Sequence, residues 1–201
     1  WKEYGETMKS ILSAYKNGSL FNIKMLDNGL IYAGGEGLAL TWMDAIVDGK
    51  PVTPRTGLAV EINGLWYNAL CFAIEMARLG KDKKFVEEWE EITRDFPAVF
   101  KETFWSKEKG YLADYVNEDY KNFQVRPNMK IAVSLPYSPI SVKIRQLVLK
   151  KVWEELLTDK GIRTLSPSDP QYKGHYGGTQ AERDLAYHQG TVWVWLLAPF
   201  A

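Results

Sequence analysis

The sequence predicts an all-α domain whose functional residues lie in long loops between the helices. Apolar side chains recur at intervals of three and four residues in several stretches, which is the spacing of one buried helix face. Between them the chain is rich in glycine, proline and aromatic residues, and no strand pattern is convincing. The helical stretches are residues 1–16, 61–79, 82–104 and 142–157, with a short helix expected after Pro127 and the start of an apolar helix at 191–201.

Glycine and proline support these boundaries. Gly18 and Gly80 follow the first two helices, because glycine readily takes the left-handed backbone of a helix end. Pro97 falls inside the third helix, which we expect it to kink or split. We interpret 162–190 as one long loop, and so long a loop in a compact domain indicates a functional role.

The composition narrows the class of protein and its partners. The chain has 201 residues, of which 46% are hydrophobic, so it forms a folded core. Lysine plus arginine and aspartate plus glutamate both number 25, and this balance argues against a nucleic-acid or anionic-membrane partner. No apolar run reaches the roughly 20 residues of a membrane helix. Neither end resembles a natural terminus, so we expect one partial domain over residues 1–201, truncated at both ends.

Cysteine and histidine usage narrows the chemistry. Cys71 is the single cysteine, which excludes an intramolecular disulfide and is compatible with a reducing compartment. We therefore expect a cytoplasmic protein. His175 and His188 are the two histidines and show no zinc-site spacing, so we expect no metal and no other cofactor.

The aromatic content points to a sugar site. Eight tryptophans and eleven tyrosines occur, many beside polar residues, as in TWMD, LWYN and YHQG. Flat aromatic faces cover the C–H faces of pyranose rings, while neighbouring polar groups bind the hydroxyls. For any single tryptophan, a place in the core remains the alternative.

Asp44 is the candidate acid in this setting. Glycoside hydrolysis uses one carboxylic acid to protonate the leaving oxygen and a second carboxylate to activate water or attack. Desolvation by the neighbours Trp42 and Met43 would favour the protonated acid. The residues alone also allow Asp44 to cap a turn after Trp42, so both interpretations stay open at this point.

Five segments together resemble the glucosidase domain of glycogen debranching enzymes of the archaeal and bacterial type. They run in the family's order from about residue 20 to the last residue. The resemblance implies an (α/α)6 toroid, only part of which is in this chain, and hydrolysis of α-1,6-linked glucose stubs by inversion. Glycogen, limit dextrin or malto-oligosaccharide would be the partner. The segments are LTWMDA, GKPVTPRTGLAVEINGLWYNAL, RPNMKIAVSLP, GIRTLSPSDPQYKGHYGG and RDLAYHQGTVWVWLLAPF.

The resemblance also implies roles for individual residues. Asp44 is the proposed general acid, and Trp42 belongs to the sugar-binding wall. Three roles stay open: Glu61 as the polar start of a helix, Arg126 as a brace for a loop carboxylate, and His188 as a structural histidine. The residues expected to bind substrate are Trp42, Arg55, Glu61, Asn63, Trp66, Arg126, Asn128, Tyr187, His188, Gln189 and Trp193.

An inverting mechanism also needs a general base, roughly 6.5–9.5 Å from the acid. The resemblance places that glutamate in a loop after YHQGTVW, beyond Ala201. Within the chain, the loop acids left to substitute are Glu36, Glu61, Glu182 and Asp184.

Two alternatives remain open beside this function. One is a catalytically silent carbohydrate-binding or regulatory domain, and the other is a trehalase-like or glucoamylase-like hydrolase. The sequence sets neither the oligomeric state nor the presence of a transferase domain.

Overall fold

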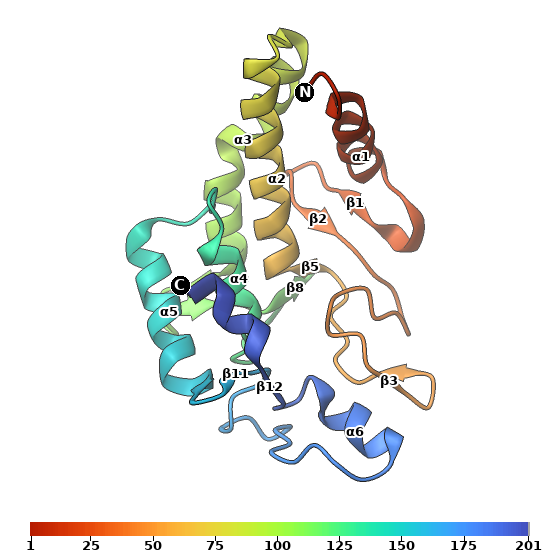
Figure 1. Ribbon diagram of the computed structural model, residues 1–201, viewed down its shortest axis with the longest axis vertical. Helices are drawn as coiled ribbons and strands as arrows, with labels where there is room; N and C mark the ends of the chain where they lie inside the picture. The colour runs from red at the N-terminus through yellow and green to blue at the C-terminus, as the bar shows by residue number, and fades with distance from the viewer. Residues whose placement is uncertain (201) are drawn as a thin grey trace.

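Two long helices, packed side by side, form the centre of the molecule. The computed structural model describes residues 1–200, with side chains for residues 1–198. Helices α2 (Val60–Leu79) and α3 (Lys83–Phe104) are joined by a short turn, and α4 (Asn128–Ser134) packs against α2. Helix α5 (Val142–Leu156) packs on α4, while α1 (Gly5–Asn17) lies on the other side of α2 (Figure 1).

The prediction of an all-α domain, as part of an (α/α)6 toroid, is wrong. Besides the helices, the described residues form five small sheets of two or three strands. Three are the antiparallel pairs β1 (Lys24–Met25) with β2 (Ile31–Tyr32), β3 (Ile46–Val47) with β4 (Lys50–Pro51), and β6 (Trp105–Ser106) with β7 (Tyr111–Leu112). The other two join β5 (Leu58–Ala59), β8 (Tyr115–Asn117) and β9 (Tyr120–Asn122), and β10 (Leu157–Thr158), β11 (Gly161–Arg163) and β12 (Val192–Trp193).

These strands are too short to be seen in the sequence. Within residues 1–200 none is longer than three residues, whereas a period of two needs four or more residues to be visible. Two of the pairings also join distant parts of the chain, Leu58 with Val116 and Ile162 with Trp193. Tertiary contacts, rather than local propensity, therefore create them.

The main helices were predicted correctly to within a few residues. The four expected stretches correspond to α1, α2, α3 and α5, and α4 follows Pro127 as expected. Helix α3 continues through Pro97, so the proline does not split it.

Two helical expectations were wrong. Helix α6 (Gln180–Tyr187) lies inside the stretch interpreted as one loop, and it begins with a capping box between Thr179 and Glu182. Residues 191–201 do not start an α-helix: β12 is followed by the 3₁₀-helix η2 (Val194–Phe200), and Ala201 lies outside the described residues. A second short 3₁₀-helix, η1, spans Leu20–Asn22.

The core fixes the place of α4 against α2. Phe96, Phe100 and Phe104 of α3 are fully buried. On α2, a side chain at Gly64 would place its Cβ 2.8 Å from the Cα of Ala132, so the glycine permits the close approach of α4. This packing holds the start of α4 near the start of α2.

The loops gather at the end of the molecule opposite the α2–α3 turn. Figure 1 shows β3, α6, β11 and β12 at this end, below the start of α2. Among residues 1–200, no helix combines the length and apolar character that crossing a membrane requires.

Candidate functional site

A buried arginine between two carboxylates forms the base of the site. Arg55 donates to both oxygens of Glu61, at 2.5 and 2.6 Å, and its Nε donates to Oδ2 of Asp114 at 2.7 Å. All three side chains are almost completely buried. Burial lowers the pKa of Arg55, but the charges of Asp114 and Glu61 outweigh it and raise the pKa above its ordinary value. Arg55 therefore stays charged and ties the start of α2 to β8.

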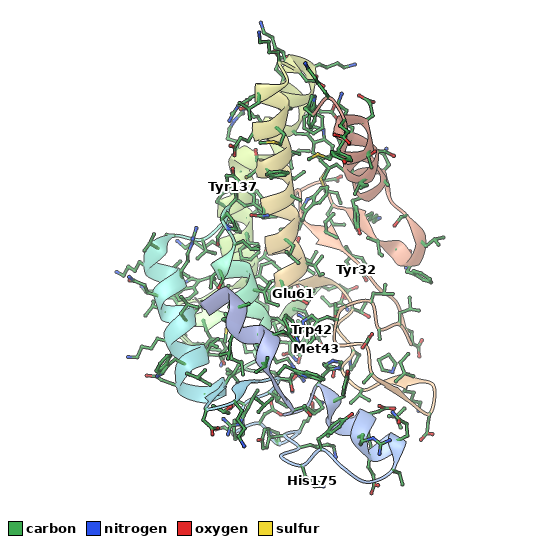
Figure 2. All side chains as sticks on the ribbon, in the orientation of Figure 1. Tyr32, Trp42, Met43, Glu61, Tyr137 and His175 are labelled. Carbon is green, nitrogen blue, oxygen red and sulfur yellow. The ribbon has the colours of Figure 1, made fainter. Side chains whose placement is uncertain are left out.

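Asn128 connects this ion-pair network to the segment that carries Asp44. Its Nδ2 donates to Oδ1 of Asp114 at 2.7 Å, and its Oδ1 accepts from the indole N–H of Trp42 at 2.8 Å. Met43 is fully buried, and its sulfur lies 3.5 Å from Asn128 Nδ2 and 3.8 Å from Arg126 Nη1. Figure 2 shows Trp42 and Met43 beside Glu61 at the start of α2.

Arg126 joins the RPN segment to the YHQG segment. Its Nη1 donates to the carbonyls of Thr164 and His188, at 3.2 and 2.7 Å. Its Nη2 donates to Oε1 of Gln189 at 2.6 Å and to Oε1 of Gln124 at 3.2 Å, and its Nε lies 3.4 Å from the same Gln124 oxygen. Burial lowers the pKa of Arg126 to about 10, so the guanidinium remains charged near neutrality. Arg126 thus binds carbonyl and amide oxygens, and among the described residues it forms no ion pair with a loop carboxylate.

His188 is buried beside the same segment. Its ring packs edge-on against Trp42, with the ring centroids 5.2 Å apart. Burial lowers the pKa of His188 to about 4, although the nearby Asp44 carboxylate acts in the opposite direction. Its Nδ1 is buried with no hydrogen-bond partner among the described residues. A neutral imidazole with an unpaired nitrogen is compatible with a ligand contact, which leaves its predicted role open.

Asp44 itself is exposed. Its predecessor Met43 is buried and Trp42 is partly buried, so the chain emerges from the core at Asp44. The desolvation expected from these two neighbours is therefore not found in this chain. Asp44 is instead accessible to solvent, next to the buried Met43.

Three of the segments meet in the structure. The bonds of Asn128 and Arg126 place TWMDA, RPN and YHQG in direct contact. Tyr187 and Trp193 belong to the same cluster: their ring centroids lie 5.0 Å apart, and Tyr187 also packs on His188 at 4.6 Å.

Asn63 and Trp66 lie elsewhere, inside the core. Asn63 accepts from the N–H of Ile31 and donates to the carbonyls of Ile31 and Ala59. Trp66 donates to the carbonyl of Gly29 at 3.1 Å. Their polar atoms are used to fix the segment before β2, so we do not carry these two residues into a substrate role.

Three of the four loop acids considered as a substitute for the general base have hydrogen-bond partners in the protein. Glu61 is paired with Arg55, and Glu182 accepts from Thr179 in the capping box of α6. Asp184 accepts from Gln180 at 2.8 Å, and Glu36 is exposed in its loop. Within the described residues, no group of three or more His, Cys, Asp or Glu side chains is placed to hold a metal ion.

Sequence reasoning missed Asp114 and Gln124. Asp114 is the carboxylate shared by Arg55 and Asn128, and Gln124 accepts from Arg126. The one signal for Asp114 was a charged residue inside the apolar run GYLADYV, because a buried carboxylate requires a cationic partner. Gln124 gave no signal.

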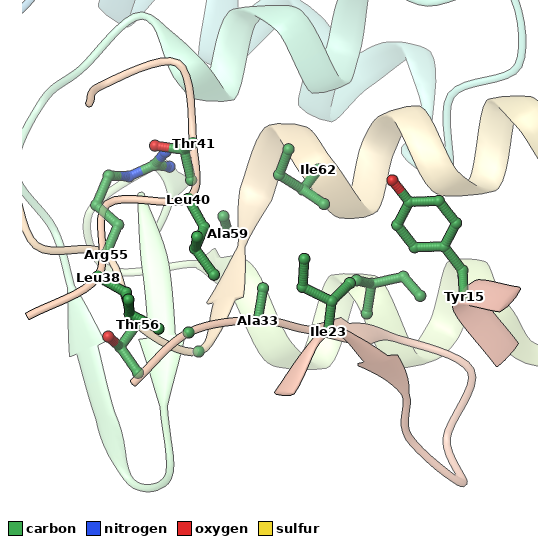
Figure 3. Close-up of a pocket in the computed structure, with 13 residues that line it drawn as sticks. Tyr15, Ile23, Ala33, Leu38, Leu40, Thr41, Arg55, Thr56, Ala59 and Ile62 are labelled. Carbon is green, nitrogen blue, oxygen red and sulfur yellow. The ribbon is translucent and has the colours of Figure 1, made fainter. Parts of the chain in front are cut away.

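A small cavity lies above the start of α2 but is mostly apolar. It has a volume of about 90 Å³ and lies between residues 38–41 and the start of α2 (Figure 3). Arg55 is at its edge, with its side chain committed to Glu61 and Asp114. Its volume is far below the roughly 300–1,000 Å³ of ligand pockets, so this cavity is a poor candidate for a sugar site.

The fold resembles a solved structure, and the sequence matches a known enzyme family. A solved structure of a sialidase superposes with a TM-score of 0.71 over 98% of this chain and 17% of that chain, at 13% identity, which supports a shared fold alone. The model of the amylo-alpha-1,6-glucosidase family matches residues 2–201. The chain belongs to the amylo-alpha-1,6-glucosidase family, and the resemblance in its motifs is confirmed.

A curated relative agrees with this assignment. The glycogen debranching enzyme of Saccharomyces cerevisiae (strain ATCC 204508 / S288c) is 31% identical over 227 aligned residues. The alignment covers 90% of this chain and 15% of the relative, so the chain spans a small part of that protein's length.

Replacing Asp114 tests the ion-pair network. Both carboxylate oxygens accept from donors, so Asp114→Asn turns an amide N–H₂ toward Arg55 or Asn128 whichever way the amide faces. We expect the free energy of unfolding to fall by roughly 2–3 kcal/mol in urea titrations of the intact protein. Asp119→Asn, in the exposed turn between β8 and β9, is the control, with an expected change within about 0.5 kcal/mol. Equal free energies of unfolding for the two variants would show that the ion-pair network does not stabilise the fold.

Lowering the pH tests the burial of His188. The folded pKa of about 4 lies below the roughly 6.5 of an unfolded chain, so the unfolded state binds the proton first. The contribution of neutral His188 to the free energy of unfolding is therefore fully present above about pH 6.5. It is lost as the pH falls toward 4, which lowers the free energy of unfolding by about 2–3 kcal/mol.

His188→Gln should flatten this decline in chemical denaturation curves measured between pH 7 and 4. His175→Gln, at the exposed second histidine, should retain the decline of the parent. Parallel curves for His188→Gln and the parent would rule out His188 as its source.

Proposed function

We propose that this chain carries the acid side of a glycoside hydrolase site that releases glucose from α-1,6-linked branch stubs of glycogen or limit dextrin. The observation that carries the proposal is the support beneath Asp44. An exposed carboxylate follows two side chains, Trp42 and Met43, that are held by Asn128 and Arg126. A proton donor on a fixed base keeps its position relative to a bound sugar.

The proposed reaction begins with a proton from Asp44. The carboxylic acid protonates the glycosidic oxygen as the bond from that oxygen to the anomeric carbon breaks. A second carboxylate removes a proton from water, which attacks the opposite face of the sugar and inverts the anomeric centre. Free glucose and the unbranched chain are the products.

The neighbouring side chains would bind the glucose stub. Trp42 packs against both His188 and Trp195, with ring centroids 5.2 and 5.0 Å apart, so its own ring orientation is restrained. An aromatic face next to the acid suits the apolar face of a pyranose. The buried His188 supports the Trp42 ring from behind, while Asn128, Arg126 and Gln189 hold the wall in place.

The family supports the substrate class. Membership in the amylo-alpha-1,6-glucosidase family and a relative named glycogen debranching enzyme both favour an α-1,6-glucosidic bond in glycogen-type carbohydrate. Because Glu61 and Glu182 already have hydrogen-bond partners, we assign the general base to neither of them. A cytoplasmic location remains a prediction of the sequence.

Replacing Asp44 tests the assignment of the acid. In the intact protein, Asp44→Asn should lower the rate of glucose release from a limit dextrin by about 100-fold or more, because the proton donor is lost. Binding of the oligosaccharide should persist. Asp48→Asn is the matched control, since Asp48 is exposed in the β3–β4 turn at φ 50°, a conformation that asparagine tolerates. Normal turnover in Asp44→Asn would remove Asp44 from the reaction.

The same assay separates the alternatives. A carbohydrate-binding domain would bind limit dextrin and release no glucose in the parent protein. Rates on panose, maltose and trehalose distinguish an α-1,6-glucosidase from a glucoamylase-like or trehalase-like enzyme. Proton NMR of the first product should show β-glucose, because inversion of an α-linkage gives the β anomer.

A further inference from the structure

A polar cleft next to the Asp44 segment has no role in the proposed reaction. It has a volume of about 300 Å³ and lies between the residues that follow β4 and the β8–β9 hairpin. This is near the lower end of ligand-pocket volumes, which run from roughly 300 to 1,000 Å³. The lining side chains that matter here are Tyr115, Tyr120, Asn122, Gln124, Gln171 and Gln189.

Carboxamides form one side of the cleft and are held in fixed orientations. Gln171 Oε1 accepts from Nε2 of Gln124 at 3.1 Å and from Nε2 of Gln189 at 3.5 Å. Oε1 of Gln189 is in turn fixed by Arg126. Gln171 is exposed, and its own N–H₂ group donates to no other described residue, so a donor remains for a ligand hydroxyl.

Two tyrosines form the aromatic side. The rings of Tyr115 and Tyr120 lie 6.0 Å apart at 57°, and Tyr120 is 58% exposed at the end of its hairpin. Asn122 donates to the Tyr120 hydroxyl at 3.3 Å. An exposed aromatic ring and amides in one cleft suit a pyranose, whose C–H face packs on the ring and whose hydroxyls bind the amides.

The charge of the cleft favours a neutral ligand. Arg55 and Arg126 both line it, but Arg55 is neutralised by Glu61 and Asp114. The Arg126 guanidinium makes five hydrogen bonds to oxygens, which equals its number of N–H donors. Neither cation is left for a phosphate or carboxylate, so the lining suits a polyol.

Arg126 also sets the relation between the cleft and Asp44. Its Nη2 faces Gln189 in the cleft wall, and its Nη1 lies against Met43, the residue before Asp44. We propose that this polar–aromatic cleft binds a glucosyl unit of the α-1,4-linked chain that carries the branch stub. The identity of that chain rests on the proposed function, whereas the binding of a malto-oligosaccharide does not.

The test measures binding without turnover. Maltoheptaose, which has no branch, is titrated calorimetrically into the intact protein carrying Asp44→Asn, with and without Tyr120→Ala or Gln171→Ala. We expect each second substitution to weaken binding roughly two- to tenfold, the range of one lost aromatic or hydrogen-bond contact. Tyr120→Phe keeps the ring and should retain the affinity, which separates loss of stacking from loss of folding. Tyr4→Ala, at an exposed tyrosine that does not line the cleft, is the control.

Unchanged affinity in both Tyr120→Ala and Gln171→Ala, or no binding of maltoheptaose at all, would overturn the proposal. Loss of affinity in Tyr120→Phe equal to that in Tyr120→Ala would also contradict it. If Asp44→Asn released glucose at the parent's rate while Tyr120→Ala still weakened binding, Asp44 would not be the general acid. The cleft would nevertheless remain an oligosaccharide-binding site.

Discussion

The ion pair of Arg55 with Glu61 and Asp114 is the interaction on which the rest of the site depends. A guanidinium excluded from water is stable only with carboxylates at hydrogen-bonding distance, and here it has two. One carboxylate belongs to the first turn of α2 and the other precedes β8. The pair therefore locks the start of the central helix to a hairpin far along the chain.

The chemistry of the site is built outward from this pair. Asp114 orients Asn128, Asn128 orients Trp42, and the buried Met43 brings the chain to the surface at Asp44. Each step is a buried or partly buried hydrogen bond or a packed side chain, so the segment has little freedom. The glycine at position 64 contributes from a distance, because it lets α4 lie close enough to α2 for Asn128 to reach Asp114.

The sequence was sufficient to predict the long helices, because α2 and α3 have enough turns for their apolar periodicity to be seen. It could not predict the sheets, since strands of two or three residues such as β5 and β11 exist through partners distant in the sequence. The toroid was inferred by resemblance and does not describe these short sheets. Helix α6 was missed although Thr179 and Glu182 carry the capping-box spacing, because the glycines before it suggested a loop.

The site shows a similar division. The motifs singled out the segments of the site, and in the structure Asn128 and Arg126 join three of these segments. They did not separate residues that face a ligand from residues that build the wall: Asn63 and Trp66 belong to the core, and Glu61 is committed to Arg55. Asp114 was missed because its importance depends on the fold, which brings it 2.7 Å from Arg55.

The decisive test of Asp44 as the proton donor is a crystal structure of the intact protein with Asp44→Asn and an α-1,6-branched malto-oligosaccharide. We expect the glycosidic oxygen of the branch within about 3 Å of the residue 44 side chain, with the stub against Trp42. We also expect the network from Arg55 to Asn128 to stay unchanged. A branch point bound elsewhere, with the residue 44 side chain facing bulk solvent, would exclude Asp44 as the donor.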